Sequence, residues 1–145
     1  MLSTVVLDTN IYIRYGADQA AAYYMSAVVI QELTAGAPDS ATIRRLGEFR
    51  RQYEAEGRLL VPTGEDWWHA GKILNAMHRG LKSHRAGRVS AIPKEEQQRI
   101  LRDVLIARTA KRANVAIVTE DVSDFFRIQR YCDVRILRPE DYFPT

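Results

Sequence analysis

Acidic residues at the ends of apolar segments are the part of this sequence best suited to chemistry. Asp8 directly follows the apolar run Val5 to Leu7, and Asp121 and Asp124 follow the run Ala116 to Thr119. Both runs have the composition of short β-strands, and ligands of open α/β sheets bind at the carboxyl ends of the strands. Each acid taken alone could simply cap the helix that follows it.

Two further acids lie within segments that read as helices. Asp103 stands beside an apolar stripe in the segment 94–114, and Glu32 belongs to the otherwise apolar segment 27–35. A carboxylate that points inward is costly unless a cation or strong donors meet it. Arg99, one turn earlier, could pair with Asp103, and Glu32 could mark the solvent side of its helix. One shared site accounts for all of these acids together.

Carboxylates gathered in one place raise one another's pKa values, and a hard divalent cation resolves that conflict. Mg²⁺ and Mn²⁺ prefer oxygen ligands and keep some water, which leaves positions for phosphate oxygens. The sequence has no His or Cys cluster for a softer metal. We therefore expect a Mg²⁺ or Mn²⁺ site for phosphoryl chemistry, at which the metal activates water for in-line attack on a phosphate.

Composition and charge fit this expectation. The chain has 145 residues, a net charge of +3 and one cysteine, so it needs no disulfide to fold and a reducing, cytoplasmic setting is expected. No signal peptide and no apolar run of the roughly 20 residues that cross a bilayer are apparent, so no membrane association is expected. Basic residues dominate positions 79–94, which indicates either a surface for a polyanion or a solvated loop.

The elements that must position these acids alternate along the chain. Hydrophobic periodicity, caps and breakers predict strands at 3–7, 23–25, 59–61, 116–119 and 134–137, and helices at 11–15, 27–35, 39–56, 65–78, 94–114 and 122–129. Segments 16–22 and 82–90 read as loops. This order predicts one α/β domain over 1–145, with a short, mostly parallel β-sheet flanked by helices on both faces.

Four segments, in this order, resemble the motifs of PIN-domain nucleases. The first is Val-Val-Leu-Asp8-Thr9-Asn10, and the second carries Glu32 in a helix after Ser26. The third is similar to the family's Asp followed by an apolar helix, here Asp103-Val-Leu-Ile-Ala. The fourth is Thr119-Glu-Asp121-Val-Ser-Asp124-Phe. Each motif alone is weak, but together they span nearly the whole chain and are similar to VapC-type toxins.

The resemblance implies an endoribonuclease of a type II toxin–antitoxin pair that uses Mg²⁺ or Mn²⁺. It implies a homodimer and a small cognate antitoxin that covers the acidic pocket. Carried over by position, Asp8, Glu32 and Asp103 would bind metal or its water, with Asp121 or Asp124 as the fourth acid. Hydrogen bonds from Thr9, Asn10 and Thr119 would orient these ligands. The products would carry a 5′-phosphate and a 3′-hydroxyl.

Two departures from the family pattern stand out. The stretch between Asp8 and Glu32 is short, and helical material that often grips the antitoxin is trimmed there. The basic segment is extended, and its Arg79, Lys82, Arg85 and Arg88 would either contact the RNA backbone or belong to a mobile loop.

Other readings stay open. The protein could process RNA without any antitoxin, or it could bind RNA without cutting it, although all the acids are present. A phosphoacceptor domain also places acids at strand ends, but it needs a Lys after a late strand, where this chain has Thr119-Glu120-Asp121. Trp67 and Trp68 are adjacent on a helix, so one is expected in the core and the other at the surface.

Overall fold

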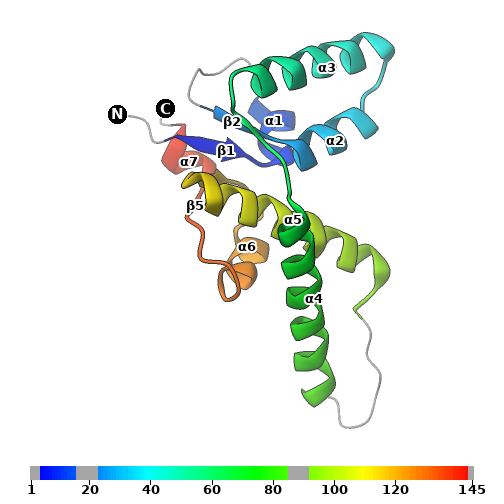
Figure 1. Ribbon diagram of the computed structural model, residues 1–145, viewed down its shortest axis with the longest axis vertical. Helices are drawn as coiled ribbons and strands as arrows, with labels where there is room; N and C mark the ends of the chain where they lie inside the picture. The colour runs from blue at the N-terminus through cyan, green and yellow to red at the C-terminus, as the bar shows by residue number, and fades with distance from the viewer. Residues whose placement is uncertain (1–3, 16–22, 85–91, 144–145) are drawn as a thin grey trace.

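The structure is a computed structural model that describes residues 4–15, 23–84 and 92–143. Five strands form one parallel sheet in the order β3-β2-β1-β4-β5 (Figure 1). The strands are β1 (Val5–Leu7), β2 (Tyr23–Ser26), β3 (Leu59–Leu60), β4 (Ala116–Val118) and β5 (Ile136–Leu137). The helices are α1 (Thr9–Tyr15), α2 (Ala27–Ala35), α3 (Ser40–Ala55), α4 (Gly64–His84), α5 (Lys94–Ala113), α6 (Val122–Gln129) and α7 (Pro139–Tyr142). The predicted α/β class is confirmed, and the sheet is wholly parallel.

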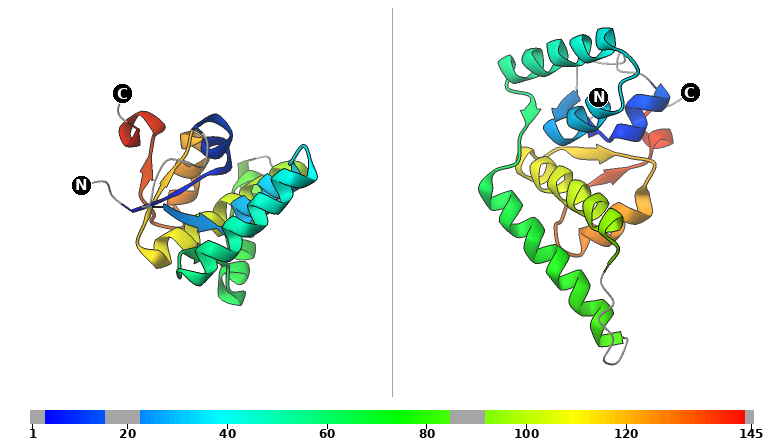
Figure 2. Two further views of the ribbon diagram at one scale, coloured as in Figure 1. Left: turned by 90° about the horizontal axis from the view of Figure 1, so that it is seen from above. Right: turned by 90° about the vertical axis from the view of Figure 1, so that its right-hand side faces the viewer.

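The strand order places helices on both faces of the sheet. The chain moves outward from β1 to β3 through α1, α2 and α3, then returns through α4 and α5 to β4. Parallel crossovers are right-handed, so the outward and return helices cover opposite faces (Figure 2). Helix α2 contacts α3 on one side and α5 on the other.

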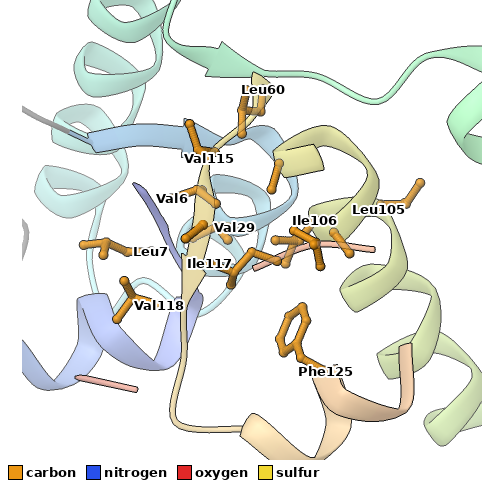
Figure 3. Close-up of a cluster of buried hydrophobic side chains, with 14 of the residues drawn as sticks. Val6, Leu7, Val29, Leu60, Leu105, Ile106, Val115, Ile117, Val118 and Phe125 are labelled. Carbon is orange, nitrogen blue, oxygen red and sulfur yellow. The ribbon is translucent and has the colours of Figure 1, made fainter. Parts of the chain in front are cut away.

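The core lies between β1, β4 and the helices of the return path. Every residue of β1 and β4 is buried, as expected for strands covered on both faces. Figure 3 shows Ile117 pointing toward Ile106 of α5 and Phe125 of α6, while Leu7 and Val118 point to the other side. This packing fixes α5 and α6 against the sheet, next to the strand ends that carry the acids.

Local sequence sets several boundaries. The Ser26 hydroxyl accepts hydrogen bonds from the amides of Val28 and Val29, at 3.1 and 3.4 Å, and so caps α2. Gly57 follows α3 with a φ of +70°, a conformation that disfavours any residue with a Cβ. Helix α4 begins at a reciprocal cap, in which Thr63 and Asp66 each accept the other's backbone amide with their side chains.

The structure corrects three expectations. Helix α4 continues to His84 instead of ending near residue 78, so residues 82–84 are helical and not loop. Strand β5 covers only Ile136–Leu137, and the tail forms α7. Trp67 and Trp68 are both exposed, because α4 turns Asp66, Ala70 and Ile73 inward. The expected loop residues 16–22 and 85–90 lie outside the described residues.

Candidate active site

Asp8 is placed by the alternation of side chains along β1. Val6 pairs with Ile117, which faces α5 and α6, and Asp8 comes two residues later on the same side. The Asp8 amide continues the ladder by donating to the carbonyl of Val118 at 3.0 Å. The carboxylate is only 5% exposed. The end of a buried strand therefore carries a buried acid directed toward the return-path helices.

Three donors hold the Asp8 carboxylate. The backbone N–H of Thr9 donates to Oδ1 at 2.8 Å, and the hydroxyl of Thr119 donates to Oδ2 at 2.8 Å. The Asn10 amide donates to Oδ2 at 3.4 Å. Burial raises the pKa of Asp8, the Thr119 and Thr9 hydrogen bonds oppose this, and the charges of Asp121 and Glu32 raise it further. These hydrogen bonds thus fix the orientation of the Asp8 carboxylate, but all three donors are neutral and do not balance its negative charge.

Asn10 and Thr119 also hold Asp121. The Asn10 amide donates to Oδ2 of Asp121 at 3.1 Å, and the Thr119 hydroxyl accepts the Asp121 amide at 3.0 Å. The Asn10 side-chain oxygen accepts the amide of Glu120 at 3.3 Å. Asp121 makes no side-chain cap to α6, so the capping alternative does not hold for it. The two residues tie the loop after β4 to the end of β1.

Asp103 approaches the same place from α5, one turn before Ile106. Its pKa is raised to about 8, first by burial and then by the negative charges of Asp8, Asp124 and Asp121, while Arg102 opposes the rise. Within the described residues, no hydrogen-bond donor contacts its carboxylate. Asp103 is therefore a half-buried acid whose charged neighbours are mainly other acids.

Asp124 and Glu32 complete the cluster, and arginines accompany both. Asp124 lies in the first turn of α6, with Arg99 at 4.0 Å and Arg127 at 3.9 Å. The alternative, a pairing of Arg99 with Asp103, is not found, and Arg99 makes a loose contact with Asp124 instead. Glu32 of α2 accepts a hydrogen bond of 2.7 Å from Nη1 of Arg102.

Five acids from four parts of the chain therefore share one electrostatic environment at the carboxyl edge of the sheet: Asp8, Glu32, Asp103, Asp121 and Asp124. Among the described residues, no three Asp, Glu, His or Cys side chains are arranged so that they could hold one metal ion. The donor set still fits a hard divalent cation, because it is made only of carboxylate oxygens and neighbouring acids raise the pKa values of both Asp8 and Asp103. Small side-chain rotations toward a cation would lower this repulsion.

Other expected residues stand elsewhere. The Thr9 hydroxyl is buried with no hydrogen-bond partner among the described residues, so Thr9 acts on Asp8 through its backbone. Arg79 lies on α4 beside Trp67 and Trp68, around an open hollow of about 480 Å³. Of the other basic residues proposed for RNA, Arg85 and Arg88 lie outside the described residues, and the side chain of Lys82 does too.

Sequence reasoning missed Arg102. Arg102 was not among the predicted site residues, yet it reaches Glu32 on a different helix. No periodicity reveals such a contact, because it depends on where α2 and α5 meet. A basic residue directly before Asp103 was the one local hint.

The fold and the acids define a class, namely α/β proteins with a carboxylate cluster at the carboxyl ends of parallel strands. The PIN domain family matches residues 5–131, and the chain belongs to this family. No curated protein matches the chain. Within the described residues, no helix has the length and apolar character to span a membrane.

Solved structures named FitAcB and VapBC have a similar fold. FitAcB from Neisseria gonorrhoeae is 21% identical with a TM-score of 0.53, covering 93% of this chain and 97% of that one. DNA-bound VapBC from Salmonella typhimurium is 21% identical with a TM-score of 0.56, covering 95% and 98%. VapBC-1 from nontypeable Haemophilus influenzae is 23% identical with a TM-score of 0.54, covering 92% and 96%. At these identities the likeness concerns the fold.

Proposed function

We propose that the protein is a Mg²⁺- or Mn²⁺-dependent endoribonuclease and the cytoplasmic toxin of a type II toxin–antitoxin pair. The observation that carries this proposal is the electrostatic coupling of buried Asp8 and half-buried Asp103 with Asp121 and Asp124. Four carboxylates that share one electrostatic environment are unfavourable without a cation, and each is supplied by a different element or loop. Membership in the PIN domain family supports nuclease chemistry at this edge of the sheet.

Each residue has a distinct part in the proposed reaction. Asp8, Asp103, Asp121 and Asp124 would hold the cation, while Asn10 and Thr119 keep Asp8 and Asp121 in position through the hydrogen bonds described above. Bound Mg²⁺ or Mn²⁺ would supply a Lewis acid for the phosphate and for water. Glu32 would orient the attacking water and accept its proton. The water oxygen would bond to phosphorus as the bond from phosphorus to the 3′-oxygen breaks. The 3′-oxygen would take a proton from solvent water, which gives a 5′-phosphate and a 3′-hydroxyl.

An antitoxin is proposed as a partner because the similar structures are complexes named VapBC and FitAcB. This chain offers a matching apolar surface. Ile13 of α1 is 76% exposed beside a hollow of about 360 Å³ that is lined by Met25, Leu33, Leu46 and Phe49. Exposed apolar surface beside such a hollow is typical of a protein-binding site. We place the antitoxin on this surface, between α1, α2 and α3.

A homodimer is proposed on separate grounds. Trp67 and Trp68 are 53% and 68% exposed on α4, on the side opposite the residues that pack on α5. Two adjacent exposed tryptophans are more apolar surface than a solvated helix usually carries, and tryptophan is enriched in the buried centres of interfaces. A second copy covering this side of α4 would remove both rings from water.

Cleavage of a defined pool of bacterial RNA tests the nuclease proposal. Purified protein is incubated with Mg²⁺, Mn²⁺ or EDTA, beside Asp8→Asn and Asp103→Asn. The matched control is Asp133→Asn, which removes an exposed carboxylate outside the cluster. We expect metal-dependent fragments with 5′-phosphates from the wild type and the control, and none from the two site variants. Equal cleavage by all four proteins would overturn the proposed site.

A further inference from the structure

Arg102 is the one cation of the described chain that is hydrogen-bonded to an acid of the cluster. Its Nη1 donates to Oε2 of Glu32 at 2.7 Å, whereas Arg99 and Arg127 stay at 4.0 and 3.9 Å from Asp124. The side chain of Glu32 is 20% exposed and that of Arg102 is 40% exposed, so the pair is open to solvent on one side. The carboxylate that the proposed mechanism needs for water is therefore occupied by the protein's own guanidinium.

The contact with Glu32 uses only part of the hydrogen-bonding capacity of Arg102. A guanidinium has five N–H donors in one plane, and Glu32 is the one acceptor that it reaches among the described residues. Its Nε is buried and has no hydrogen-bond partner there. A buried donor without an acceptor is unfavourable, so the arrangement is poor for a purely structural ion pair. The arrangement suits an arginine whose remaining N–H groups gain a hydrogen-bond acceptor when a ligand binds.

An open hollow lies against this pair. It has a volume of about 560 Å³ and lies between α2 and α5, lined in part by Gln31, Glu32, Gln98, Leu101 and Arg102. That volume is in the range that small ligands occupy. Its wall combines Arg102, the side-chain amides of Gln31 and Gln98, apolar surface and the two carboxylates of Glu32 and Glu95. The arginine, the amides and the apolar surface are groups that meet the phosphate, base edge and base face of a nucleotide.

We propose that this hollow binds the nucleotide next to the cleaved bond of an RNA strand, and that Arg102 moves from Glu32 to its phosphate. The inference rests on the proposed ribonuclease function and names how its substrate is held. In the RNA-free protein Arg102 neutralises Glu32. When RNA enters, the phosphate takes over the guanidinium, and Glu32 becomes free beside the other acids. Substrate binding and release of Glu32 are thus one event.

The two glutamines extend the same site. Gln31 precedes Glu32 on α2, and Gln98 lies one turn before Arg102 on α5, so both amides border the hollow. Each carries a donor and an acceptor that can read a base edge. Gln31→Ala and Gln98→Ala should change which base is preferred next to the cleaved bond. Both should leave the salt dependence of RNA binding unchanged.

The test measures binding of a fluorescent single-stranded RNA to an inactive Asp8→Asn parent, by anisotropy over a series of salt concentrations. Arg102→Gln weakens binding about tenfold, the size expected for one lost charge-assisted hydrogen bond. It also lowers the slope of log Kd against log salt by about 0.7, the value for one phosphate contact on a single strand. Arg102→Lys recovers the slope but only part of the affinity, because lysine keeps the charge without the planar fork.

Arg99→Gln is the matched control, because it removes the same charge from α5 one turn earlier. It leaves the salt slope nearly unchanged. Equal effects of Arg99→Gln and Arg102→Gln would show a general electrostatic attraction of RNA to the protein. That result would overturn the proposed contact between Arg102 and the phosphate. Circular dichroism of each variant verifies folding, since Arg102 also joins α2 to α5.

The Glu32→Gln variant distinguishes the proposed transfer of Arg102 from Glu32 to the phosphate from a purely structural ion pair between α2 and α5. In the Asp8→Asn parent it frees Arg102 and tightens RNA binding several-fold, and adding Arg102→Gln abolishes that gain. An equal gain with and without Arg102 would overturn the exchange. If the parent binds no RNA and wild-type protein cuts none, the proposed function fails as well. If RNA is cut normally while Arg102→Gln binds like the parent, only this inference fails.

Discussion

The hydroxyl of Thr119 donates to Oδ2 of Asp8 at 2.8 Å, although 111 residues separate them in the chain. The same hydroxyl accepts the backbone amide of Asp121 at 3.0 Å. One oxygen thus fixes an acid at the end of β1 and an acid after β4. Both partners are buried at 5% exposure or less, so water does not replace the contact easily.

Thr119→Val should therefore damage the site more than the core. The valine keeps the shape but leaves a buried Asp8 oxygen with one donor fewer, which costs about 1–3 kcal/mol of stability. Loss of such an orienting contact lowers metal affinity or activity by about 10- to 100-fold. Calorimetric titration with Mn²⁺ and RNA cleavage measure the two effects.

Thr109→Val is the control for that change. Thr109 is equally buried, but its hydroxyl donates only to the carbonyls of Leu105 and Ile106 within its own helix. Metal affinity should stay unchanged in this variant. If both variants lose metal affinity equally, the Thr119 hydroxyl does not position Asp8 for metal.

A second prediction concerns how stability depends on pH in the metal-free protein. Burial and neighbouring acids raise the pKa of Asp103 from 3.8 to about 8 in the folded state. Between these values the folded protein holds a proton that the unfolded chain has lost, so the free energy of unfolding falls as pH rises. The raised pKa of Asp8 acts in the same direction.

Urea unfolding at pH 5 and pH 8.5 in EDTA checks this prediction. The wild type should lose stability at the higher pH, and Asp103→Asn should lose less because its side chain carries no charge. Added Mg²⁺ should restore wild-type stability at pH 8.5, since a ligand of the folded state stabilises it. A larger loss in Asp103→Asn than in wild type would contradict the assignment.

The placement of Asp8 and Asp121 could be predicted because it follows from local rules. Apolar runs of three or four residues that end in an acid put that acid at the carboxyl edge of a parallel sheet. The bounds of α2 and α3 were predictable for similar reasons, because Ser26 caps one and Gly57 ends the other at positive φ. Such features act over a few residues and need no knowledge of packing.

Features that depend on distant packing were not predictable. Helix α4 runs through Gly80 to His84, since a single glycine costs a helix only about 1 kcal/mol. The side of α4 that faces the core follows from its contact with α5, which leaves both tryptophans outside. The link from Arg102 to Glu32 likewise depends on how two helices meet.

The exposed tryptophans give a test of the homodimer. If a second copy covers Trp67 and Trp68, their emission should shift to shorter wavelength as protein concentration rises through the dimer dissociation constant. Light scattering on the same samples measures the mass. Trp68→Ala should give a monomer at concentrations where wild type is dimeric, and its stability as a monomer should change by no more than about 0.5 kcal/mol. A dimer that persists with unshifted emission would place the interface elsewhere.

The last prediction concerns Asp66, a buried acid outside the candidate site. It is 1% exposed, and its two oxygens meet Arg108, at 3.0 Å, and Arg112. Its Oδ2 also accepts the Thr63 amide at 2.9 Å, so one carboxylate joins the start of α4 to the end of α5. Asp66→Asn leaves two arginines without their counter-charge, which should cost about 3–5 kcal/mol of stability.

Chemical denaturation measures that loss, and Glu65→Gln is the control because its side chain is 75% exposed in the same turn. The control should change stability by no more than about 0.5 kcal/mol. Below the unfolding midpoint, Asp66→Asn should bind Mn²⁺ as wild type does, because Asp66 serves the packing of α4 on α5. A loss of metal binding in folded Asp66→Asn would mean that α4 also sets the position of Asp103, and that stability and function are coupled through α5.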